Sequence, residues 1–312
     1  MSLYSKILKR KKTAAIVDEM LNDLKTIIIV KNSKGFKKLL RQLTNILVNT
    51  FDTQSEKAIK EVITYLTDIG EGGYDGSIKK EVKRILKEKL GKNFSALVED
   101  SFYDLNSKIY EQGIKEVGAS VKLKLGFEVN DVEAAGLLGK QNFFWVKNHY
   151  TDKLSGEFDA ILDGYFDGDK TIKEIADDFE LRFQERVGSG RSYYEGLAEH
   201  TTNTLNEYGK IRGLKKSGLK FYEFVFINDD RQSEICGYLS GKLSGKKFSV
   251  ADANDFIDKK ILTVEDPREL KDITPFHTLD ELKEFDFENL PEGFGVYLFH
   301  YRCRTKKVAH FD

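Results

Sequence analysis

Proline is nearly absent from this 312-residue chain, and the few prolines all lie near one end. The sequence holds three, Pro267, Pro275 and Pro291. Proline removes a main-chain donor and its ring clashes with the preceding helical turn, so long helices are favoured where it is missing. The chain is therefore predicted to be mostly helical over its first two-thirds and more irregular towards its end.

Apolar residues recur at helical spacing through most of that first part. Between Thr13 and Ile69 they form three amphipathic stretches, each predicted to be a helix. Glycines at 71–77, at Gly91 and at 188–190 are predicted to separate the helices that follow. These further helices are expected at 77–90, 95–117, 131–154, 171–186 and 192–216.

The hydrophobic period changes after Gly218, where LKFYEFVFI is typical of a strand that ends at residues 228–230. The predicted fold class is α+β, with a mostly helical N-terminal two-thirds and a small C-terminal α+β domain. The segment 118–130, a short strand or an irregular connector, marks the predicted domain boundary. We expect a helical domain over 1–130 and a second domain over 131–312, with helices at 131–217 and an α+β end at 218–312.

Charge is balanced overall, with 50 basic and 51 acidic residues, but it is unevenly distributed. The first 50 residues carry 11 Lys and Arg against 3 Asp and Glu, a surplus of 8 positive charges. A basic arm of this kind suits packaged DNA or an acidic protein surface, and a solvated tail is the alternative. No apolar run approaches the length of a membrane span, so we expect a soluble, unexported protein and no membrane partner. The candidate contacts in the arm are Lys6, Lys9, Arg10, Lys11 and Lys12.

Both cysteines of the chain stand in polar, charge-rich stretches. Cys236 ends NDDRQSEIC, and Cys303 lies in FHYRCRT. Two cysteines cannot form a disulfide framework, and a reducing compartment would keep them as thiols or metal ligands. The surroundings of these two residues therefore carry the main functional information in the sequence.

Three short elements follow the predicted strand in a distinctive order. The first contains Asp229, Asp230, Arg231, Ser233 and Cys236, the second Gly245, Lys246 and Phe248, and the closing one His300, Cys303 and Arg304. In this order they resemble the phage head morphogenesis (Mu F-like) family of minor head proteins, and the resemblance covers about residues 140–308. The second element is expected to be a hairpin. The chain departs from the family pattern at Tyr301, where proline is frequent, and at Leu239 and Thr305, where richer versions carry further cysteines.

The resemblance implies a structural protein of the virion head or host cytoplasm, not an enzyme, with no catalytic residues. Its implied partners are the portal protein and a major capsid or scaffolding protein, and its implied role is to assist head assembly and DNA packaging or delivery. Residues 1–130 match no known family. An effector or toxin-type enzyme carried on a Mu F-like domain is one alternative, expected only within residues 1–130 because the chain ends soon after Cys303. A DNA-binding accessory protein is another.

Four interpretations of the cysteine elements stay open. In the favoured one, they form a structural clasp without a cofactor, in which His300 bonds the main chain, the thiols pack, and Arg231 or Arg304 pairs with an aspartate. Zinc is the second, with Cys236, His300 and Cys303 as ligands and Asp229 or Asp230 as the fourth. A disulfide is the third. A thiol nucleophile is the fourth, although the sequence has no recognisable oxyanion loop.

A calcium site is a further hypothesis, in the stretch LDGYFDGDKTIKE. Asp163, Asp167, Gly168 and Glu174 fall at positions 1, 5, 6 and 12 of an EF-hand-like loop, but Tyr165 stands at position 3 and cannot serve as that ligand. The simpler interpretation is a glycine-rich turn that leads into a capped helix.

Overall fold

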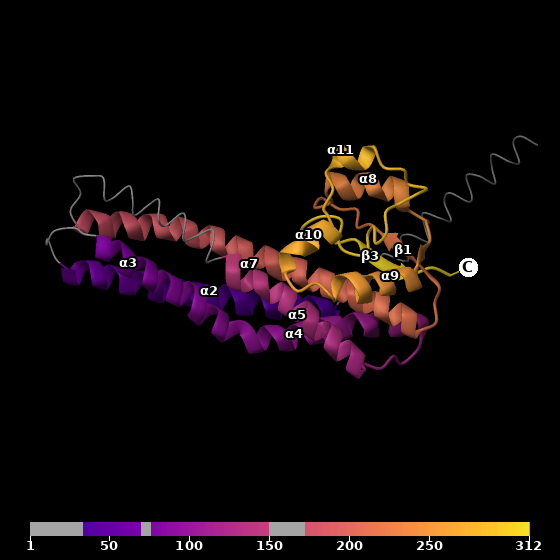
Figure 1. Cartoon of the computed structure of the whole chain (residues 1–312), viewed down its shortest axis with the longest axis horizontal. Helices are drawn as coiled ribbons and strands as arrows, with labels where there is room; N and C mark the ends of the chain where they lie inside the picture. Colours follow the sequence, from indigo (N-terminus) through magenta and orange to yellow (C-terminus); the bar gives the residue numbers. More distant parts are fainter. Residues whose placement is uncertain (1–33, 70–75, 150–171, 312) are drawn as a thin grey trace, which may run out of the picture.

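The computed structural model describes residues 34–69, 76–149 and 172–311. Helices dominate them, and a small antiparallel sheet lies near the C-terminus, so the predicted α+β class is confirmed (Figure 1). The basic arm lies outside the described residues, and so does the loop of the calcium hypothesis up to residue 171.

Three long helices form the body of the molecule. They are α2 (Lys34–Ile69), α4 (Phe94–Val121) and α7 (Ile172–Lys216), and they run together along its long axis (Figure 1). Each buries apolar residues in one shared core, among them Phe51 of α2 and Phe102 of α4, both fully buried. This burial is the main force that holds the bundle together.

Glycine does not end the helices where the sequence predicted it would. The helix α3 (Gly76–Leu86) runs through a π-helical stretch, η1 (Lys87–Asn93), directly into α4, and Gly91 lies inside η1. The three helices predicted between Thr13 and Ile69 are also wrong for the described part, where α2 is continuous. Glycine inside a helix costs about 1 kcal/mol, less than burial of Leu90 and the neighbouring apolar side chains returns.

The predicted break at 188–190 is wrong for a related reason. The helix α7 passes through it without interruption. Gly190 faces the ring of Phe51, and a Cβ atom at this position would lie 2.5 Å from the ring's Cζ. The glycine therefore allows close packing of α7 on α2.

Close packing also explains two glycines where α4 crosses α7. A Cβ atom on Gly113 would lie 2.2 Å from the carbonyl oxygen of Asn206, and one on Gly209 would lie 2.0 Å from that of Tyr110. The two backbones touch at this crossing. Any larger residue at either glycine would force the helices apart.

The helix α5 (Val129–His149) follows α4 after an irregular connection without a strand, so the connector alternative is correct. The connection begins at Lys122, in the left-handed conformation with φ of 58°. At the start of α5, buried Asp131 accepts a 2.6 Å bond from Lys216 of α7. The boundary predicted near residue 130 thus falls between two helices that share one core with α7.

The C-terminal lobe is built on a three-stranded antiparallel sheet of order β2-β1-β3. The central strand β1 (Phe221–Val225) lies in the segment predicted as a strand, and β3 (Lys306–Ala309) is the last element. Around the sheet lie α8 (Glu234–Leu243), α9 (Val250–Phe256) with its π-helical continuation η3 (Ile257–Ile261), η4 (Pro267–Glu269), α10 (Leu270–Ile273) and α11 (Leu279–Lys283).

The hairpin predicted for the second element is wrong. The first half of GYLSGKLSGKKFSV belongs to α8, which ends before Gly245 (φ +75°) turns the chain into the short strand β2 (Phe248–Ser249). This strand pairs with β1, Phe248 opposite Tyr222. Because Ser233 caps α8, the helix is stabilised despite its glycines.

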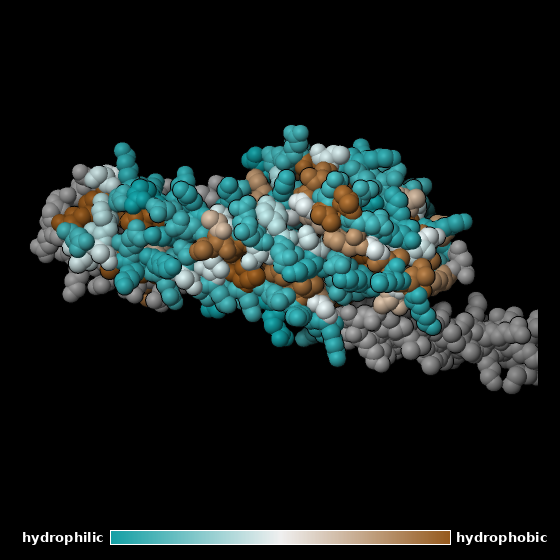
Figure 2. Space-filling model, turned by 90° about the horizontal axis from the view of Figure 1, so that it is seen from below, coloured by the Kyte–Doolittle hydropathy of each residue, from teal (hydrophilic) through white to brown (hydrophobic). Residues whose placement is uncertain are grey.

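Figure 2 shows one long face of the molecule, on which hydrophilic side chains predominate and surround separate apolar patches. Within the described ranges, no helix is both long and apolar enough to cross a membrane.

Candidate functional site

The first element places Cys236 in the opening turn of α8. Ser233 has extended backbone angles, and its Oγ accepts a 3.1 Å hydrogen bond from the main-chain N–H of Cys236. Before it, Asp229 Oδ1 accepts from the N–H of Arg231 at 3.0 Å, which tightens the turn after β1. Local capping of this kind fixes the direction of the Cys236 side chain.

The closing element forms a tight turn that presents His300 and Cys303 to the same place. The N–H of Cys303 donates to the carbonyl of His300 at 3.1 Å, and Arg302 adopts a positive φ of 61° within the turn. His300 Nδ1 lies 2.8 Å from the carbonyl of Tyr301, which can only accept, so Nδ1 carries a proton. The other ring nitrogen, Nε2, therefore faces the thiols.

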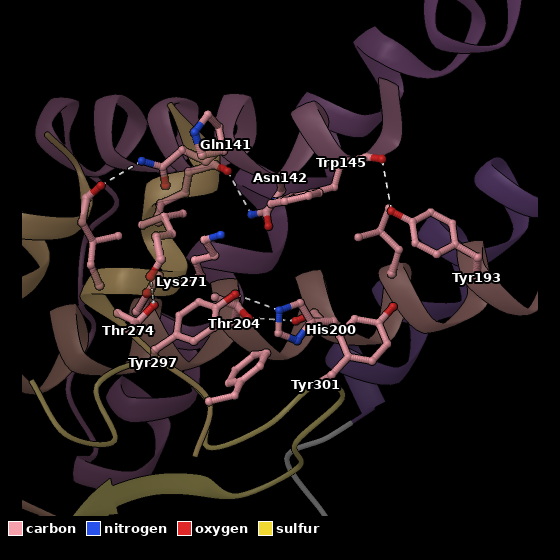
Figure 3. Close-up of a pocket in the computed structure, with 17 residues that line it drawn as sticks. Gln141, Asn142, Trp145, Tyr193, His200, Thr204, Lys271, Thr274, Tyr297 and Tyr301 are labelled. Atoms are coloured by element: carbon pink, nitrogen blue, oxygen red, sulfur yellow. Dashed lines mark hydrogen bonds between the residues drawn. The ribbon is translucent and has the colours of Figure 1, made fainter. Parts of the chain in front are cut away.

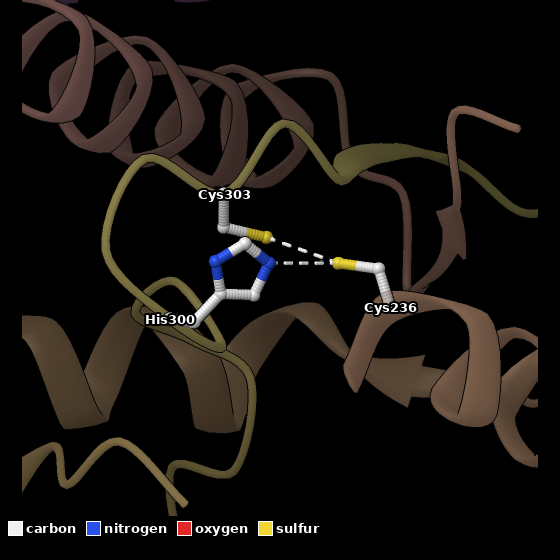
Figure 4. Close-up of side chains that lie close together, drawn as sticks. All are labelled: Cys236, His300 and Cys303. Atoms are coloured by element: carbon white, nitrogen blue, oxygen red, sulfur yellow. Dashed lines mark hydrogen bonds between the residues drawn. The ribbon is translucent and has the colours of Figure 1, made fainter. Parts of the chain in front are cut away.

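Cys236, His300 and Cys303 meet in a cluster that we call the thiol cluster (Figure 4). Cys236 Sγ lies 3.1 Å from His300 Nε2 and 3.6 Å from Cys303 Sγ. The hydroxyls of Thr305 and Ser233 complete its surroundings, at 3.4 Å from each sulfur and 2.8 Å from His300 Nε2, respectively. The three residues that were considered together as possible ligands from the sequence are thus also close in space.

The titration of these three groups is linked. The hydrogen bond from Cys236 lowers the pKa of the Cys303 thiol despite its burial, and His300 acts in the same direction. The same sulfur contact raises the pKa of Cys236, and burial adds to this rise. Burial alone would lower the pKa of His300, but its interaction with Cys303 raises it. Negative charge is therefore favoured on Cys303 and positive charge on His300, which pair inside the cluster.

The donor set of the thiol cluster fits zinc in part. Two sulfurs at about 2.3 Å from a tetrahedral zinc ion would be roughly 3.7 Å apart, close to the observed 3.6 Å. The three candidate ligand atoms all lie within 4.8 Å of one another. Two sulfurs and one imidazole nitrogen are ligands that zinc prefers, and a fourth position would remain for another donor.

The two aspartates considered as a fourth ligand lie outside this group. Asp229 binds the guanidinium of Arg304 through both carboxylate oxygens, at 2.6 and 2.7 Å. This pairing lowers the pKa of Asp229 to about 2. Asp230 is exposed and is not among the clustered ligand atoms. The Arg304–Asp229 pair is one of those expected of the structural clasp.

The remaining residues of the three sequence elements make their contacts outside the thiol cluster. Arg231 binds Glu199 of α7 at 2.8 Å instead of an aspartate. Lys246 binds the carbonyl of Phe287 and the carboxylate of Glu288, and Phe248 packs on β1. The second element therefore braces the lobe and does not touch the thiol cluster.

Sequence reasoning missed the part of α7 that lies beneath the lobe. Glu199 accepts from Arg231 at 2.8 Å and from Arg302 at 2.6 Å, so it holds both the first and the closing element. His200 receives the main-chain N–H of Arg302 at 3.4 Å. The only signal was the polar run EHTTNTLNE inside a predicted helix, which by itself is typical of a solvated face.

A second unpredicted group, which we call the charge cluster, fastens β3 to α7. Buried Glu207 binds Lys210 at 2.9 Å and lies 3.4 Å from Lys306, whose ammonium also reaches Asn203 at 3.1 Å. The N–H of Lys307 donates to Glu207 at 2.7 Å. Burial would raise the pKa of Glu207, but the three lysines outweigh it and lower the pKa to about 2.

No family model, curated protein or solved structure matches this chain. Its function has to be inferred from its own residues and contacts.

Proposed function

We propose that this chain is a minor head protein of a tailed phage, a structural component that binds the portal or procapsid and assists head assembly and DNA packaging or delivery. The observation that supports this best is the meeting of the first and closing elements in the thiol cluster. Those elements carry the resemblance to minor head proteins, and they lie 67 residues apart in the sequence at Cys236 and Cys303.

The contacts between the first and the closing element hold two distant parts of the C-terminal lobe together. Two salt-bridged oxygens of Asp229 hold Arg304, and Ser233 and Cys236 both contact His300. Each contact joins the start of α8 to the turn before β3. A structural clasp needs such an arrangement because it removes freedom from the 60-odd residues between its ends.

Burial favours a structural role over thiol catalysis. Cys303, the sulfur on which negative charge is favoured, has no exposed surface, and Cys236 is 6% exposed. A nucleophile must reach its substrate, so these sulfurs are poorly placed for attack. Packing also weighs against the effector alternative, because the described helices before residue 130 form one core with α7.

The proposal is tested by native purification of complexes that contain the full chain, followed by quantitative mass spectrometry. We expect portal and major capsid proteins at a fixed ratio to this chain, which would also give its copy number. Recovery of the chain alone, or beside an enzyme, would overturn the proposal.

DNA contact through the basic arm is measured separately. We expect the full chain to bind duplex DNA with an affinity that falls steeply as salt rises, because each neutralised phosphate releases counterions. Replacing Lys6, Lys9, Arg10, Lys11 and Lys12 with glutamine should flatten that dependence and leave portal binding intact. An unchanged salt dependence would assign the arm to a protein surface.

A further inference from the structure

A cavity of about 340 Å³ lies where the C-terminal lobe meets the helical bundle. Residues of α5, α7 and α10 line it, together with the segment 297–301 before the closing turn (Figure 3). The residues of the thiol cluster are not part of its lining. Its size falls in the range of small-molecule sites, which begins near 300 Å³.

Aromatic rings form much of the wall. Trp145 of α5, Phe276 and Tyr301 line the cavity yet keep 38%, 44% and 43% of their surface exposed. Phe276 stacks on Tyr297 with ring centroids 5.7 Å apart, and Tyr301 lies 4.9 Å from the ring of His200. Flat apolar surfaces at the edge of a cavity favour a planar ligand that would cover them.

One buried polar group of the lining has no partner. The hydroxyl of Tyr208 makes no hydrogen bond within the described part of the chain, although the residue is only 1% exposed. Burial raises its pKa well above the usual value, so the group is a neutral donor at pH 7. A buried hydroxyl left unpaired costs free energy, which a ligand with an acceptor atom would recover.

His200 does not supply a charge to the cavity. Burial lowers its pKa to about 4, so the ring is neutral at pH 7. Both ring nitrogens are engaged, Nε2 with the hydroxyl of Tyr297 at 2.7 Å and Nδ1 with the N–H of Arg302 at 3.4 Å. The histidine therefore acts as part of the wall.

Lys271 supplies the positive charge. It reaches the lining from α10 and is the charged side chain among the lining residues when His200 is neutral. The nearby arginines are paired, Arg268 with Asp266 at 2.6 Å and Arg302 with Glu199 at 2.6 Å. An exposed ammonium beside an aromatic cavity favours an anionic ligand.

We propose that this cavity binds a planar aromatic carboxylate of one or two fused rings. The ring system lies among Trp145, Tyr297 and Tyr301, the carboxylate binds Lys271, and an acceptor on the ring receives the hydroxyl of Tyr208. Because α5, α7 and α10 all contribute, the bound acid fastens the lobe to the bundle. This binding activity is additional to a role in head assembly and does not depend on it.

The test uses 6-hydroxy-2-naphthoate as the probe and its neutral amide as the matched compound. Trp145, the single tryptophan of the chain, reports binding through its fluorescence. We expect saturable binding of the acid and about tenfold weaker binding of the amide, the loss typical of one charge-assisted hydrogen bond. Lys271→Met should remove this difference, whereas Lys140→Met, at an exposed site on α5 outside the cavity, should keep it. Tyr208→Phe keeps the aromatic ring and should weaken the binding of both compounds several-fold.

Three results would each overturn the proposal. The first is the absence of a saturable change in Trp145 fluorescence with either compound. The second is equal affinity for acid and amide in the unaltered chain, and the third is a preference for the acid that survives Lys271→Met. Lys271 is exposed, so its replacement leaves the fold intact, and circular dichroism of each variant checks this.

Discussion

The lobe is fastened at two places that differ in chemistry. The thiol cluster joins the start of α8 to the closing turn with two sulfurs and an imidazole, among which one thiolate–imidazolium pair is favoured, and a second charge pair, Arg304–Asp229, lies nearby. The charge cluster joins β3 to α7 with formal charges that are almost fully buried. Thiols tolerate the loss of a partner better than buried charged side chains do. Substitutions in the thiol cluster and in the charge cluster should therefore change the stability of the protein by very different amounts.

The largest effect is expected from Glu207→Gln. This change keeps the shape but leaves Lys306 buried near a neutral amide, and it leaves Lys210 with the more distant carboxylate of Glu116, at 3.5 Å. Breaking a buried ion pair on one side costs about 3–5 kcal/mol, and urea denaturation followed by circular dichroism measures it.

Glu133→Gln is the matched control, because Glu133 is exposed on α5. Surface changes of this kind stay within about 0.5 kcal/mol. If Glu207→Gln destabilised the protein no more than this control, Glu207 would not be what stabilises the buried lysines, and the contrast between the two clusters would fail.

Acid should weaken the charge cluster in a defined window. The pKa of Glu207 is lowered to about 2 in the folded protein, against 4.5 ordinarily. Its contribution to stability is therefore complete above pH 4.5 and is lost as the pH falls through about 2, a change of roughly 3 kcal/mol. Unfolding free energies measured from pH 6 down to pH 2 should show this loss, and Glu207→Gln should lack it. An identical acid dependence in the two proteins would contradict the assignment.

The thiol cluster could be predicted from the sequence, but the charge cluster could not. The two cysteines stood out by their rarity, and the resemblance placed His300 beside them, so the thiol cluster was predictable. Glu207 ends a polar run that is typical of an exposed helix face, and Lys210 follows it three residues later. They are buried because α2, α4 and β3 cover α7 from several sides, a result of tertiary packing that no local pattern contains.

The predictions of helix ends at glycines were wrong for the same reason, because they considered only local sequence. Gly190 is a reasonable helix break when only its neighbours are considered. In the folded chain it meets Phe51, which is 139 positions earlier, and the space it leaves is what lets α7 continue. The hairpin expected at Gly245 was a local error, since Ser233 already provided a helix cap that outweighed the glycines of α8.

A moderate effect is expected at the thiol cluster. Cys303→Ser and His300→Ala should each destabilise the lobe by about 1–3 kcal/mol, since each leaves a buried polar partner unpaired. Thermal unfolding followed by near-ultraviolet circular dichroism measures this, with exposed Ser244→Ala as the control. No change in melting temperature would contradict the structural clasp.

Elemental analysis of the unaltered protein, purified without chelators, tests whether the thiol cluster binds zinc. About one zinc per chain, lost in Cys303→Ser, would add a metal to the clasp. A value near zero would remove that interpretation and leave the thiol pair as the clasp itself.

The smallest effect is expected at the Arg304–Asp229 pair. Arg304→Lys keeps the charge but loses the two-point contact with the carboxylate, so the melting temperature should fall by about 1–2 °C at low salt. Because Asp229 is exposed, this difference should shrink in 1 M NaCl, where the Debye length is about 3 Å. The loss of stability caused by Glu207→Gln should persist in 1 M NaCl, because the charges of the charge cluster are buried and salt ions cannot approach them. If salt acted equally on both variants, burial would not be what separates the two clusters.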